Sequence, residues 1–193
     1  MINDCIDRAE VFGIVLLRNG ATEENEETIH RVGVTARITD VERLEGGRMN
    51  IMCEAEMRFR ISRLTQQKPF WKGDVQLFEE EQPVESVESL YEKVAQLYRR
   101  IAALNSDLSG SPQSEIILPE SATDLSYLLA YVLDIDSEEK QKMLEMRSTS
   151  ERLQTLVVHL TETIQNFEKQ ITYKKIQTKV RGNGDLGQPG REN

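Results

Sequence analysis

The stretch that decides the fold is Val32–Glu81, VGVTARITDVERLEGGRMNIMCEAEMRFRISRLTQQKPFWKGDVQLFEEE. Its side chains alternate with a period near two, which indicates consecutive antiparallel strands. Gly46 and Gly47 supply a turn, and Pro69 breaks the pattern once more. The sequence therefore predicts a four-strand meander, with strands at residues 32–40, 48–54, 57–64 and 71–78.

The two faces of this meander are expected to differ. Along residues 57–64, Arg58 and Arg60 alternate with Phe59 and Ile61, so one face is predicted to be wet and the other packed. Before the meander, residues 11–17 form a continuous apolar run. We interpret this run as a strand that is buried on both faces.

After Pro83 the apolar period changes from two to about 3.6, which is typical of helices. We therefore predict a β-rich subdomain at residues 1–82, a helical bundle at residues 83–180 and a disordered tail at residues 181–193. Within the first part, residues 1–8 have helical spacing. The expected helices of the second part cover residues 87–104, 121–133, 136–146 and 151–179, with a loop from Asn105 to Pro119.

Composition favours a cytoplasmic protein with protein partners. The chain has 193 residues, 38% hydrophobic and 30% charged, with a formal net charge of −9. That charge opposes binding to nucleic acid and to anionic lipid, because both require basic side chains. Cys5 and Cys53 give no disulfide framework, and we expect Cys53 to pack in the core. No apolar run is long enough for a membrane span, and the start lacks the basic region of a signal peptide.

Catalytic motifs are not found in the sequence. No glycine is followed by Lys-Ser or Lys-Thr, so a phosphate-binding loop is not predicted. The two histidines, His30 and His159, have neither metal-ligand spacing nor a convincing Ser-His arrangement. The sequence predicts no catalytic residue, no metal site and no cofactor.

Several motifs together resemble the N-terminal domain of the Lon ATP-dependent proteases and its stand-alone relatives, over nearly the whole chain. They are Phe12-Gly13-Ile14, Val32 to Ile38, Glu45-Gly46-Gly47-Arg48, Arg58-Phe59-Arg60-Ile61, Pro69-Phe70, Glu139-Lys140-Gln141, Leu144-Glu145 and Glu151-Arg152-Leu153. The resemblance implies an α+β fold, a PUA-like antiparallel pseudo-barrel followed by an α-helical bundle with a long last helix. It also implies a role in recognising substrates and supporting assembly, without the ATPase and Ser-Lys peptidase domains.

The chain departs from this family at two places. The family usually opens with a strand rich in Leu, Pro and Phe before the first helix, whereas Met1 falls inside the expected helix. Either Met1 is a misassigned start or the sheet has an unpaired edge. The second departure is Ala55, where the family commonly has Gly, so a bulge or bend there is in question.

The leading hypothesis is a non-catalytic module that binds unfolded or client proteins. Its candidate binding residues are Phe70, Trp71, Met49, Met52, Met57 and Arg58, with core packing as the alternative for the methionines and for the two aromatic residues. Two other functions are left open. PUA-like folds elsewhere bind RNA, and the chain could carry a peptidase label through its family alone. A homo-oligomer is also left open.

Overall fold

The computed structural model describes residues 1–18, 26–66, 68–81, 86–111 and 115–182. By its internal contacts the chain divides into two compact units. The first contains Met1–Gln82 and Leu133–Ser148, and the second contains Pro83–Val132 and Thr149–Asn193. Most of the expected tail, residues 183–193, lies outside the described part of the chain.

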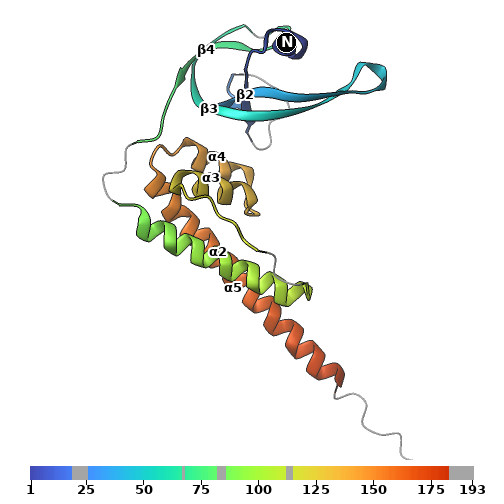
Figure 1. Ribbon diagram of the computed structural model, residues 1–193, viewed down its shortest axis with the longest axis vertical. Coiled ribbons are helices and arrows are strands. Elements are labelled where there is room, and N and C mark those ends of the chain that lie inside the picture. The colour runs from blue at the N-terminus through green and yellow to red at the C-terminus, as the bar shows by residue number, and fades with distance from the viewer. Residues whose placement is uncertain (19–25, 67, 82–85, 112–114, 183–193) are drawn as a thin grey trace, which may run out of the picture. The chain divides into compact units, whose positions relative to one another are not determined.

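The first unit is built on an antiparallel sheet of four strands in the order β1-β2-β3-β4 (Figure 1). A short helix, α1, precedes the sheet, as the sequence predicts. These elements are α1 Ile2–Arg8, β1 Phe12–Leu17, β2 Ile29–Arg43, β3 Met49–Gln66 and β4 Lys72–Leu77. The predicted antiparallel sheet and the α+β class are confirmed.

The strand boundaries correct the prediction at one place. Residues 48–54 and 57–64 were expected to be separate strands, but both belong to the single strand β3. Ala55 and Glu56 continue the extended backbone, because neither residue favours a turn. The true turn lies at Glu45–Gly47, where Gly46 and Gly47 have φ of 75° and 77°, a conformation that glycine adopts without steric cost.

A β-bulge lies in β3 beside Ala55. Val34 pairs with Arg58 but Ala36 pairs with Ala55, so β3 holds one more residue than β2 between these pairs. The Thr35 hydroxyl accepts a hydrogen bond from Met57 N at 3.1 Å and donates one to Met57 O at 3.3 Å. Since a side chain satisfies the backbone of the bulge, the irregularity persists with alanine at position 55.

The apolar strand β1 is not buried on both faces, which corrects the prediction. Ile14 is 47% exposed and Leu17 is 36% exposed. The core of this unit lies on one side of the strand only, where Ile29, Phe59 and Ile61 cluster with Val15 and Leu64. A continuous apolar run predicts a strand whose two faces are both buried, but in this fold only one face of β1 packs against other residues.

The helix α4, Ser137–Glu145, groups with the sheet and not with the other helices. The buried side chain of Gln141 donates a hydrogen bond to Val32 O at 3.0 Å and another to Glu145 Oε1 at 2.8 Å. This amide therefore fastens α4 to the backbone of β2. The predicted boundaries, residues 1–82 and 83–180, stay a prediction.

The second unit contains the helices α2 Glu88–Ser109, α3 Ala122–Val132 and α5 Thr149–Gly182. In Figure 1, α2 runs along α5, and α3 also packs on α5. The apolar stripes that predict these helices form its core, which includes Val94, Leu125, Leu129, Leu153, Leu156 and Leu160. The loop expected from Asn105 begins later, because α2 continues to a left-handed cap at Gly110. None of the helices in the described part of the chain has the length and apolar character needed to cross a bilayer.

We expect Asp136→Ala to lower the free energy of unfolding by about 1 kcal/mol. Asp136 caps α4, because its carboxylate accepts a hydrogen bond from Glu139 N at 2.9 Å. Asp136→Ser, which keeps a capping oxygen, serves as the control and should retain most of the stability. Urea unfolding measures both variants, and equal loss in both would contradict the capping role.

Candidate functional site

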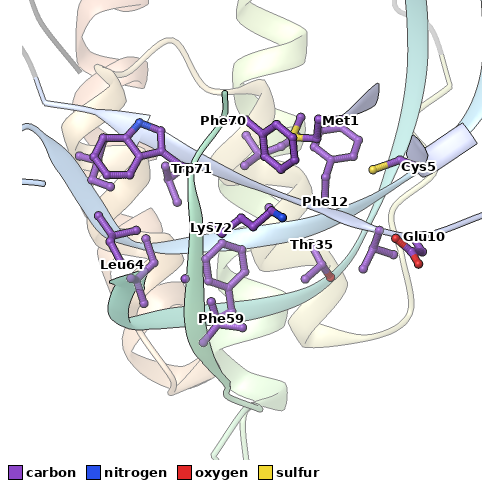
Figure 2. A pocket seen from close by; sticks show the side chains of 18 of the residues that line it. Met1, Cys5, Glu10, Phe12, Thr35, Phe59, Leu64, Phe70, Trp71 and Lys72 are labelled. Carbon is purple, nitrogen blue, oxygen red and sulfur yellow. The ribbon is translucent and has the colours of Figure 1, made fainter. Parts of the chain in front are cut away.

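The first unit contains a large open pocket with a volume of about 890 Å³. It is bordered by α1, β1, β4 and residues 69–71, and we call it the edge groove. Figure 2 shows the side chains around it, including the aromatic residues Phe12, Phe59, Phe70 and Trp71. Pockets of about 300–1,000 Å³ with mostly apolar lining are typical of binding sites.

The floor of the edge groove is the sheet core itself. Phe59 lies under β1 and β2, since a Cβ atom built on Gly13 would lie 2.9 Å from Phe59 Cζ and one on Gly33 would lie 3.0 Å from it. Both positions therefore need a residue without a side chain for the Phe59 ring to lie where it does. Ile29 and Ile61 complete the apolar floor.

Phe70 and Trp71 lie on the wall of the edge groove, just before β4. Both are half-buried, and Lys72 Nζ lies 5.1 Å from the centre of the Phe70 ring. Aromatic side chains at such positions contribute large apolar contact areas, and they lose little conformational entropy on binding.

Charges on the rim of the edge groove are balanced. Arg8 Nη1 lies 3.9 Å from Glu10 Oε1, and the N-terminal amino group lies 3.2 Å from Asp4 Oδ2. Lys72 adds one further positive charge to the lining. The rim therefore lacks the strong acidic character of the chain as a whole.

The candidate binding residues do not form one cluster. Phe70 and Trp71 lie together in the edge groove, whereas the methionines and Arg58 lie outside its lining. Met52 and Met57 are 66% and 47% exposed, so core packing is wrong for these two. Met49 is half-buried. Cys53 is exposed rather than in the core, because the hairpin around it is uncovered on that side.

Arg58 was expected on a wet face, but its side chain is only 9% exposed. It donates hydrogen bonds to Leu144 O at 2.8 Å, to Met146 O at 2.5 Å and to Glu80 Oε1 at 2.9 Å. The segment that follows α4 covers this part of β3, so the predicted wet face is closed at Arg58. Its role in the structure is to hold that segment.

The described residues contain no group of three or more His, Cys, Asp or Glu side chains that could hold a metal ion. His30 is buried, with Nε2 3.0 Å from Glu138 Oε2 and Nδ1 3.6 Å from Glu145 Oε1. These contacts link β2 to α4, as Gln141 does. His30 therefore helps to pack α4 against β2.

Sequence reasoning missed the groove residues of the two outer strands. Phe12 and Ile14 come from β1, and Val75 comes from β4. The apolar run of residues 11–17 indicated these residues, because a strand covered on one face needs apolar side chains only at alternate positions. It was interpreted as burial within the chain, because a sequence does not show whether cover is present.

A PUA-like antiparallel sheet unit and a helical unit are the architecture that the resemblance implies. The family profile described as "ATP-dependent protease La (LON) substrate-binding domain" matches residues 1–162. The chain belongs to this family, which confirms the resemblance.

Full-length relatives and solved structures agree with this assignment. The chain is 28% identical to a Lon protease of Cytophaga hutchinsonii over 88% of its own length and 21% of the relative's. It is 24% identical to a Lon protease of Flavobacterium johnsoniae, over its whole length and 23% of the relative's. The chain thus spans about a fifth to a quarter of the length of these curated relatives.

The fold is similar to that of a Lon N-terminal domain protein from Xanthomonas campestris, with a TM-score of 0.59 and 18% identity, covering 81% of this chain and 80% of that one. It is also similar to the N-terminal domain of Mycobacterium avium complex Lon protease, with a TM-score of 0.50 and 21% identity, covering 79% of this chain and 90% of that one. At these identities the likeness concerns the fold.

Proposed function

We propose that this chain is a non-catalytic protein-binding module that recognises unfolded or client proteins at the edge groove. The observation that carries the proposal is the uncovered apolar lining of the groove, with Phe70 and Trp71 on its wall. The family description as a substrate-binding domain supports it. An exposed apolar groove rimmed by polar residues is one of the features that mark sites for another protein.

We further propose that the module has no peptidase activity of its own. The relatives are named Lon protease, but the matched family profile is that of the substrate-binding domain. Hydrolysis of casein with and without ATP is the test. Cleavage that survives further purification of the chain would contradict the proposal.

The RNA-binding alternative rests on the strand face with Arg58 and Arg60 and on the Lys-rich end of the chain, and it loses Arg58. Arg58 is buried against Leu144 O, Met146 O and Glu80, and a phosphate contact would require a basic side chain on the surface. The net charge of −9 also opposes the alternative. A gel shift with RNA that weakens steeply with salt would restore it.

We place the module in the cytoplasm, as a proposal supported by its two cysteines, which are both free. Association with a second copy of the chain also stays a proposal. The boundaries between the β-rich subdomain, residues 1–82, and the helical bundle, residues 83–180, stay a proposal too. Limited proteolysis would report the boundaries, and light scattering would report the oligomeric state.

We expect the double variant Phe70→Ala/Trp71→Ala to weaken the binding of a denatured model protein about tenfold or more, since aromatic anchors dominate many interfaces. The control is Met52→Ala, because Met52 is 66% exposed and lies outside the groove lining. A pull-down with reduced, unfolded α-lactalbumin measures all three proteins. If Met52→Ala weakens binding as much as the double variant does, the groove is not the binding site.

A further inference from the structure

We propose that the client segment bound in the edge groove is an extended, uncharged apolar peptide that pairs with β1 as an added strand. This inference rests on the proposed function, because it specifies the form of the client at the same site. It goes further in assigning the main-chain contact to β1 and the side-chain contacts to the groove.

Both edge strands of the sheet, β1 and β4, border the edge groove. Among the described strands, β1 pairs only with β2, and β4 pairs only with β3. Yet residues of both end strands line the edge groove, among them Ile14 of β1 and Val75 of β4. The sheet is therefore curved, so that its two edge strands border the same groove. An edge strand presents unpaired main-chain donors and acceptors, with which an incoming segment can pair.

The side chains at this edge are apolar and uncovered. Val11, Ile14 and Leu17 of the β1 region are 38%, 47% and 36% exposed, and all three line the groove. A strand laid beside β1 would direct alternate side chains toward the floor formed by Ile29, Phe59 and Ile61. The groove thus selects a segment with apolar residues at every second position.

The charges select an uncharged segment. The acids of the rim, Asp4 and Glu10, are each paired with a basic group. A peptide of either sign would therefore find no unpaired opposite charge among these groups, and the remaining cation of the lining, Lys72, lies over the Phe70 ring. Burying an unpaired charge at the apolar floor would also be costly.

The size of the edge favours a peptide over a second copy of the chain. β1 has six residues, which corresponds to an edge of about 20 Å. Stable interfaces between two folded proteins bury about 1,200–2,000 Å², which is much more than pairing along one edge of this length supplies. A flexible segment needs less area, because it also places side chains inside the groove.

The test uses the fluorescence of Trp71, which is the only tryptophan of the chain and lies in the groove. The probe is an uncharged eight-residue peptide that alternates Leu or Val with Ser or Thr. Its two controls carry the same side chains but are N-methylated at alternate residues, each on a different edge of the peptide, which removes the main-chain donors on that edge. We expect the probe to shift Trp71 emission, and N-methylation on the pairing edge to weaken binding about tenfold or more.

Two variants locate the contact on the protein. Leu17→Lys places a charge on β1 beside the floor residue Ile29, with which Leu17 pairs, and Met57→Lys places one on β3 outside the groove; the native side chains are 36% and 47% exposed. We expect Leu17→Lys to weaken peptide binding at least tenfold and Met57→Lys to leave it unchanged. Circular dichroism of both variants checks that the fold is retained.

Each contrary outcome has a defined meaning. If both N-methylated edges bind as tightly as the probe, side chains dock without strand pairing and the proposal is overturned, while client binding stands. If the denatured protein is retained but Trp71 does not respond to the probe, the groove is not the strand site. Trp71 could also be shielded from the probe by a second copy of the chain or by an upstream segment in a longer natural form. In that case the segment that occupies the edge groove is not a client. If no denatured protein is retained at all, the proposed function itself fails.

Discussion

Arg58→Met is expected to lower the free energy of unfolding of the first unit by about 3 kcal/mol. The Arg58 guanidinium donates hydrogen bonds to Leu144 O, Met146 O and Glu80 Oε1. It also lies 4.6 Å from the centre of the Phe78 ring. Methionine preserves much of the packing volume but removes every donor, so two carbonyl groups and a carboxylate lose a buried partner. Urea unfolding measures the loss, and hydrogen exchange should show faster opening at residues 137–146.

The matched control is Arg63→Met on the same strand. Arg63 also binds a carboxylate, with Nη2 2.9 Å from Asp74 Oδ2, but the two side chains are 75% and 60% exposed. Exposed ion pairs contribute about 0–1 kcal/mol. A loss for Arg58→Met no greater than that for Arg63→Met would show that the segment after α4 is not held by Arg58.

Arg58 also illustrates what the sequence could not predict. Alternation along β3 correctly places Phe59 in the core and Arg58 on the other face, because side chains of a strand alternate. Whether that other face meets water depends on residues 144–146, more than 80 positions away in sequence. Periodicity is a local signal, so it does not report a contact of that range.

The helices were predicted more closely than the strands. The apolar stripes of α2, α3 and α5 repeat over many turns, and the capping residues Asp136 and Ser121 mark two of the starts. A stripe identifies a helix but does not name the surface that it covers. The grouping of α4 with the sheet therefore required the three-dimensional contacts of Gln141 and Arg58.

The candidate site was predicted in part. Phe70 and Trp71 were singled out because they lie beside a turn, and both line the edge groove. The methionines were chosen for their adaptable side chains, a property that carries no information about position. The residues of β1 were missed, because their apolar run was interpreted as evidence that the chain itself covers them.

Gly33→Ala is expected to destabilise the first unit by about 3 kcal/mol, the upper range for overpacking. Local propensity predicts the opposite sign, since alanine restricts the unfolded chain more than glycine does. However, a Cβ atom at Gly33 would lie 2.2 Å from Ile14 O and 2.7 Å from Val15 Cγ1. The first of these is a backbone atom, so β1 must move away from β2 to admit a methyl group.

Gly13→Ala is the matched control in the neighbouring strand. A Cβ atom there would meet only the Phe59 ring, at 2.9 Å from Cζ, and a side chain can shift more cheaply than a strand. Gly13→Ala should therefore cost about 1 kcal/mol, with both variants measured by urea unfolding. Because β1 borders the edge groove, Gly33→Ala should also change the emission of Trp71 in the folded protein. Equal stability losses in the two variants would mean that Gly33 does not set the spacing of β1 and β2. In that case the floor residues Ile29, Phe59 and Ile61 would determine the width of the groove.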